Sequence, residues 1–138
     1  MRGHWELLAQ LREALGTEPN VRFALLFGSA ARGDDTADSD VDLLVEMRDD
    51  SYTRLLDLAV KLERLLEREV QLLTFEEAGS NPLLLADASR EGRVIIDREG
   101  RWPKFSSKRS ALERQARADY RSQKRRALAG IDRLLTGS

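Results

Sequence analysis

Residues 28–45, GSAARGDDTADSDVDLLV, contain the features that decide the fold of this chain. The segment opens with Gly28-Ser29 directly after an apolar run, and it ends in a second apolar run that begins at Asp40-Val41-Asp42. Short apolar runs rich in β-forming residues and bounded by Gly or polar residues are typical of buried strands. We therefore predict two strands joined by a helical turn and a polar loop, over residues 21–27, 41–45, 29–33 and 34–39 respectively.

The flanking sequence predicts helices and further strands on both sides of this segment. Apolar residues recur at helical spacing over three segments, at 5–15, about 51–68 and about 107–135. Asn81-Pro82 is typical of the cap and first residue of a helix that ends before Gly92. Strands are predicted at 70–74 and 94–96, and regular structure is predicted to break over 97–103. This order predicts an α/β (α+β) fold, with a small mixed sheet flanked by helices and a basic helix at the C-terminus.

The composition limits the class of protein. A length of 138 residues fits one domain, and 41% hydrophobic with 34% charged residues is typical of a soluble globular chain. The absence of cysteine excludes a disulfide framework, a thiolate metal site and a cysteine nucleophile. Because no segment has the apolar length of a bilayer span or a secretory signal, we predict a cytoplasmic protein with no membrane partner.

The charge divides the chain into two parts. Residues 1–103 contain 13 Lys and Arg against 21 Asp and Glu, a net charge of −8, whereas residues 104–138 contain 10 against 3, a net charge of +7. We predict a main domain over 1–103 and a basic helical extension over 104–138. Such an extension either binds an anionic partner, nucleic acid or protein, or folds back on the acidic body. Protein contact is favoured by an apolar stripe on this helix, formed by Leu112, Ala116, Tyr120, Ala127, Ile131 and Leu134.

Asp40 and Asp42 are the predicted catalytic and metal-binding pair. Residues two apart on a strand point to the same face, so these two carboxylates can converge on one divalent cation. Oxygen ligands of this kind suit Mg²⁺, which keeps waters and takes further ligands from phosphate.

Gly28 and Ser29 supply a complementary phosphate site. They follow a strand and open a helical turn, where free backbone N–H groups bind anions. Arg32, in the same turn, either contacts a triphosphate or pairs with one of the nearby Asp34, Asp35 and Asp38. A metal-bound triphosphate held between these elements would undergo in-line attack at its α-phosphate, with release of pyrophosphate.

Gly28-Ser29, ten intervening residues and Asp40-Val41-Asp42 together resemble the signature of the DNA polymerase β-like nucleotidyltransferase superfamily. The whole string resembles the minimal nucleotidyltransferase (MNT) branch, and the resemblance covers roughly residues 5–98. It implies ATP as substrate, Mg²⁺ as cofactor, and nucleotide binding by Gly28, Ser29, Arg32 and Ser39. It also implies a HEPN-domain protein partner, because members often act as antitoxins that transfer AMP to a HEPN toxin.

One position departs from the pattern of that family. A third carboxylate commonly lies on the strand after the long helix, where this chain has Gln71. A glutamine coordinates weakly through its carbonyl and cannot act as a base. Glu69 either substitutes for it or is a solvated charge at the strand end. Three functions therefore stay open: a protein adenylyltransferase, a catalytically weakened antitoxin that binds its partner, and an RNA (tRNA) nucleotidyltransferase that uses the basic helix.

Overall fold

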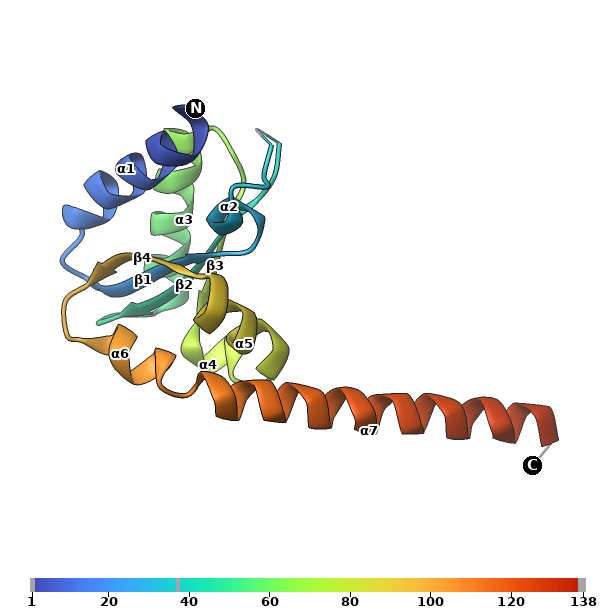
Figure 1. Cartoon of the computed structure of the whole chain (residues 1–138). Coiled ribbons are helices and arrows are strands. Elements are labelled where there is room, and N and C mark those ends of the chain that lie inside the picture. Colours follow the sequence, from blue (N-terminus) through green and yellow to red (C-terminus); the bar gives the residue numbers. More distant parts are fainter. Residues whose placement is uncertain (1, 37, 137–138) are drawn as a thin grey trace.

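The computed structural model describes residues 2–36 and 38–136, together with the side chains of most of them. Ala37 of the predicted loop and the side chain of Arg133 lie outside the described part. The predicted helices and strands are present in the predicted order, together with two short helices that were not predicted (Figure 1). The elements are α1 (Arg2–Gly16), β1 (Val21–Phe27), α2 (Ser29–Arg32), β2 (Val41–Met47), α3 (Tyr52–Leu66), β3 (Val70–Thr74), α4 (Phe75–Ala78), α5 (Pro82–Glu91), β4 (Arg93–Asp97), α6 (Arg101–Ser106) and α7 (Arg109–Thr136).

The four strands form one mixed sheet in the order β3-β2-β1-β4. β1 pairs antiparallel with both β2 and β4, whereas β2 and β3 are parallel because α3 returns the chain between them. The predicted fold class and the small mixed sheet are thereby confirmed.

Helices cover both faces of the sheet, and each face has its own apolar core. On one face, Leu11 and Leu15 of α1 and Leu62 of α3 pack against alternate residues of β1 and β2. On the other, Phe23 and Leu25 of β1 pack with residues of α4, α5, α6 and the start of α7. Burial of these side chains is the main stabilising contribution to the fold.

Two short helices were not predicted. α4 begins with a capping box, in which the Thr74 hydroxyl accepts from the Glu77 amide and the Glu77 carboxylate accepts from the Thr74 amide. α6 lies where a break in regular structure was predicted. Its first amides, from Arg101 and Trp102, donate to Asp97, which satisfies them from outside the helix. The predicted cap of α5 is confirmed, since Asn81 accepts from the Leu84 amide and Pro82 is the first helical residue.

α7 is the basic helix that the sequence predicted. Its first half packs along α5, where Leu112 joins the second core and Arg109 donates to the Ser89 carbonyl at 2.6 Å. Its second half extends past the rest of the molecule (Figure 1). Phe105 of α6 is buried in the body, so the helical part of the basic extension begins inside the packed domain. None of the described helices combines the length and the apolarity that a membrane span needs.

Candidate active site

The predicted site residues come from the hairpin of β1 and β2. Phe27, the last residue of β1, pairs with Asp42 near the start of β2. The glycine that follows Phe27 therefore lies beside the acidic end of β2. The structure thus brings together the predicted phosphate-binding turn and the predicted carboxylate pair, as the hairpin-like arrangement required.

Gly28 is in direct proximity to Asp42. Its φ of 74° is in the left-handed region, and a β-carbon built on it would lie 2.7 Å from Asp42 Oδ2. A side chain at this position would be strained by the backbone conformation and would collide with the carboxylate. Because glycine has no side chain, the backbone of the turn can lie close to the Asp42 carboxylate without a collision.

The surroundings of Asp42 disfavour the ionised form of its carboxyl group. Burial is the main cause that raises the pKa of its carboxyl group, and the charge of Asp40 raises it further. A divalent cation between the two carboxylates would relieve both the repulsion that Asp42 experiences from Asp40 and part of its desolvation.

Gln71 stands beside this pair on the neighbouring strand. In the parallel ladder Asp42 pairs with Gln71, and Gln71 Nε2 donates to Asp40 Oδ2 at 3.4 Å. Glu69 has an exposed side chain, and its carbonyl accepts from the Val41 amide. Among the described residues, no three Asp, Glu or His side chains converge, so the acidic centre consists of two carboxylates and one amide.

Arg32 is held by two carboxylates. Its Nε is 3.0 Å from Asp34 Oδ2, and its Nη1 is 3.0 Å from Glu91 Oε2 at the end of α5. The sequence left open whether Arg32 pairs with Asp34, Asp35 or Asp38, and in the structure it pairs with Asp34. The pairing with Glu91 was not foreseen, because 59 residues separate the two positions.

The two serines differ in their surroundings. Ser29 is the first residue of α2, where helix amides lack intrahelical acceptors. Ser39 accepts from the Thr36 amide at 2.9 Å, so its hydroxyl closes a turn in the loop before Asp40. Ser39 thus shapes the loop between the two halves of the site.

Sequence reasoning missed Arg68. It lies just before β3, and its Nε donates to the Ser39 carbonyl at 3.0 Å. Its Nη2 is 2.7 Å from Asp35 Oδ2, and both side chains are largely buried, at 13% and 12% exposed. Arg68 therefore ties the loop that leads into Asp40 to the base of β3. No local signal reveals this, since the contact spans 29 residues of sequence.

A scan against protein-family models matches residues 9–101 to the family described as "Polymerase beta, Nucleotidyltransferase". The matched region contains the whole sheet and the acidic centre. The chain belongs to the polymerase β nucleotidyltransferase family.

Two proteins of Methanocaldococcus jannaschii are similar in sequence to this chain, and both carry the name "Putative protein adenylyltransferase". One is 36% identical over 72 residues, which are 50% of this chain and 72% of the relative. The other is 32% identical over 82 residues, which are 54% of this chain and 95% of the relative.

Solved structures with the same fold include toxin–antitoxin complexes. One, described as a toxin–antitoxin with AMP-PNP, has a TM-score of 0.68 at 20% identity, with 88% of this chain and 98% of that chain covered. Another is a chain of a structure described as a tri-AMPylated Shewanella oneidensis HEPN toxin in complex with MNT antitoxin; its TM-score is 0.58 at 20% identity, with 91% of this chain and 96% of that chain covered. At this identity the likeness shows a shared fold.

Proposed function

We propose that this chain is a Mg²⁺-dependent nucleotidyltransferase that transfers AMP from ATP to a protein hydroxyl, and that it acts in the cytoplasm as the antitoxin of a HEPN-domain toxin. The observation that carries the proposal is the close approach of Gly28 to Asp42, which brings the Gly28-Ser29 turn beside the two carboxylates of Asp40 and Asp42. The adenylyltransferase names of two relatives and the toxin–antitoxin complexes among the structural relatives support it.

The donor set fits Mg²⁺. Asp40 and Asp42 offer carboxylate oxygens, and the Gln71 carbonyl is a weaker oxygen ligand on the next strand. Gly28 leaves space at Asp42 that a side chain would fill. When bound, the metal supplies positive charge to the triphosphate and to the α-phosphate in the transition state.

The residues of the chain then have distinct roles. Gly28 and Ser29 hold the phosphates through the backbone of the turn, and Arg32 exchanges Glu91 for a phosphate oxygen. The acceptor oxygen forms a bond to the α-phosphorus, the bond from that phosphorus to the oxygen bridging to the β-phosphate breaks, and pyrophosphate leaves. The hydroxyl proton goes to water, because the amide of Gln71 cannot accept it.

Label transfer from ATP marked at its α-phosphate tests this proposal. The purified chain, Mg²⁺ and a co-expressed HEPN-domain protein are incubated beside an Asp40→Asn/Asp42→Asn variant confirmed to be folded. Label on the HEPN protein with the intact pair, and none with the variant, is the expected result. Label that is sensitive to ribonuclease instead of protease would make RNA the acceptor and would contradict the proposed substrate.

Gln71 favours a second candidate, a weakened nucleotidyltransferase that neutralises its partner by binding alone. Its amide donates a hydrogen bond to Asp40, and an amide cannot act as a general base. On this reading Asp40→Asn leaves toxin neutralisation in growing cells intact. Loss of neutralisation by Asp40→Asn, while the complex still forms, would exclude binding alone.

A further inference from the structure

The apolar face of α7 is longer than the helix that covers it. Arg109 contacts the Ser89 carbonyl near the end of α5, and Tyr120 lies beside Leu83 and Asn81 near its start. The two helices therefore run antiparallel, and the N-terminal end of α5 lies beside α7 at about residue 124. In the remaining turns of α7, no described side chain from another element covers the exposed apolar residues.

The uncovered residues lie on the same side of α7 as those that face α5. At 100° per residue, positions 120, 124, 127, 128, 131, 134 and 135 fall within one face of the helix. The large apolar side chains among them are more than half exposed, with Leu134 at 84% and Leu135 at 81%; the others are Tyr120, Leu128 and Ile131. A face of this kind on a surface helix is typical of an interface.

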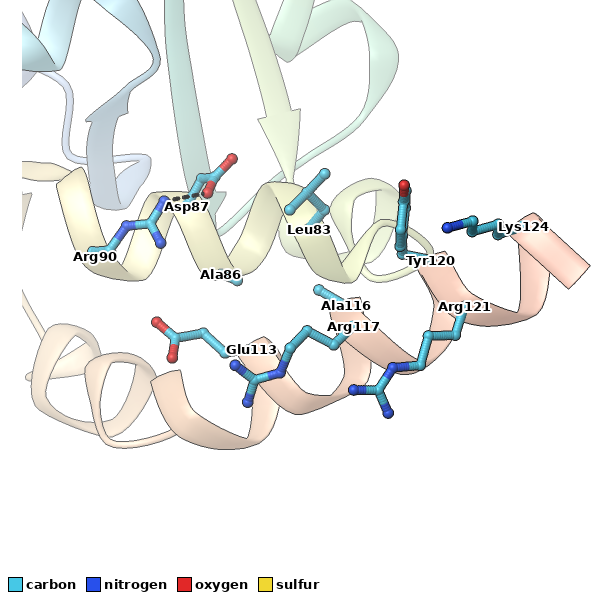
Figure 2. A pocket seen from close by; sticks show the side chains of 10 residues that line it. All are labelled: Leu83, Ala86, Asp87, Arg90, Glu113, Ala116, Arg117, Tyr120, Arg121 and Lys124. Atoms are coloured by element: carbon cyan, nitrogen blue, oxygen red, sulfur yellow. Dashed lines mark hydrogen bonds and ion pairs between the residues drawn. The ribbon is translucent and has the colours of Figure 1, made fainter.

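A groove of about 650 Å³ between α5 and α7 begins this surface. Its apolar wall consists of Leu83 and Ala86 from α5 and Ala116 and Tyr120 from α7 (Figure 2). The groove and the uncovered stripe are continuous, because Tyr120 belongs to both. Together they present about 20 residues of α7, which at 1.5 Å per residue correspond to about 30 Å of helix.

The charged side chains that α7 contributes to this surface are mostly positive, and Glu113 is the acidic exception in the groove. Arg117, Arg121 and Lys124 line the groove (Figure 2), and none of them forms an ion pair with another described side chain. Arg90, on the opposite wall, is neutralised by Asp87 at 2.7 Å. A second copy of α7 would bring like charges together, so charge complementarity favours an acidic occupant.

We propose that the groove and the exposed face of α7 bind an amphipathic helix of another protein, with an apolar stripe that meets Tyr120, Leu128 and Ile131 and with Asp and Glu on the flank that faces Arg117, Arg121 and Lys124. This helix extends the line of α5 along α7. The surface is built without any residue of the nucleotide site, so the inference stands independently of the proposed function.

A fluorescence experiment tests this directly, since the full chain has no cysteine and an introduced one is labelled uniquely. Ile131→Cys carries an environment-sensitive fluorophore on the apolar face, and Ala129→Cys carries it on the opposite face as the matched control. The probe is a designed 20-residue helix with a Leu stripe and Glu flanks. Its partner probe has Lys in place of every Glu.

We expect saturable binding of the Glu helix. The fluorophore at position 131 should report this binding, the fluorophore at position 129 should not, and the affinity should fall as the salt concentration rises. The Lys helix and a Leu128→Ser/Ile131→Ser chain should each bind about tenfold or more weakly. Equal binding of the two helices would overturn the proposal. A dimer in sedimentation that Leu128→Ser/Ile131→Ser dissociates would assign the face to a second copy, and tighter binding of single-stranded RNA than of the Glu helix would assign it to nucleic acid. Unchanged thermal unfolding of the exposed-site variants confirms that they are folded.

Discussion

A β-carbon on Gly28 would lie 2.7 Å from Oδ2 of Asp42, so the backbone of the turn and the carboxylate occupy adjoining space. We expect Gly28→Ala to weaken Mg²⁺-dependent ATP binding by about tenfold or more, because either the turn or Asp42 must move. Isothermal titration with ATP and Mg²⁺ measures this effect.

Gly100→Ala is the matched control for that variant. Gly100 has a similar φ of +70°, but apart from its two chain neighbours no described residue has an atom within 4 Å of a β-carbon built there. Backbone strain should cost each variant stability on the order of 1 kcal/mol, and Gly28→Ala should lose more because of its collision with Asp42. Normal ATP binding in Gly28→Ala would show that the contact with Asp42 has no role in the site.

Asp42→Asn should abolish transfer and yet raise the stability of the nucleotide-free protein by a few degrees in Tm. Burial and Asp40 raise the pKa of Asp42, so the folded state holds the proton more tightly than the unfolded chain. The ionised group therefore destabilises the fold at neutral pH, and this cost disappears as pH falls below the ordinary carboxyl range. Thermal unfolding at pH 7 and at pH 3.5 compares the two proteins, and a Tm gain that persists unchanged at pH 3.5 would contradict this explanation.

Gln71→Asp should raise the rate of transfer by about tenfold or more. The substitution adds a carboxylate opposite Asp42 that can ligate the metal and accept the proton of the incoming hydroxyl. Without metal, the third negative charge should lower the Tm, and Mg²⁺ should restore it. Single-turnover label transfer measures the rate. A Gln71→Ala variant with the same gain would show that the amide is inhibitory and that the carboxylate adds nothing.

Arg68→Gln should reduce the affinity for Mg²⁺-ATP because the loop before Asp40 loses its anchor on the Ser39 carbonyl and on Asp35. Arg98→Gln provides the matched control. Arg98 makes a comparable set of bonds to the carbonyls of Val21, Leu15 and Gly16, at the opposite end of β1 from the site. Both variants should lose stability, and only Arg68→Gln should lose ATP affinity. Equal effects on affinity would assign Arg68 a purely structural role.

Much of this protein follows from local sequence. The apolar runs 21–27 and 41–45 predicted β1 and β2, and Asn81-Pro82 predicted the start of α5. The Gly28-Ser29 and Asp40-Val41-Asp42 motifs predicted a shared site, because a short connection between two strands brings its ends together. These features depend on side-chain periodicity and turn chemistry, which act over a few residues.

The short helices α4 and α6 were missed because their stabilisation is not local. α6 obtains the acceptors for its first amides from Asp97, and its Phe105 is buried against Phe75 at a ring distance of 5.4 Å. A six-residue helix has too few internal hydrogen bonds to be marked by its own sequence.

The sequence alone determined the strands, the carboxylate pair, the glycine beside it and the charge of the last helix, since each is a property of neighbouring residues. Only the tertiary structure decided that Arg68 anchors the loop before Asp40, that Arg32 pairs with Glu91, and that α5 ends before the apolar stripe of α7 does. These relationships join residues that are distant in the chain. They depend on how the sheet and helices pack, and no spacing in the sequence encodes that packing.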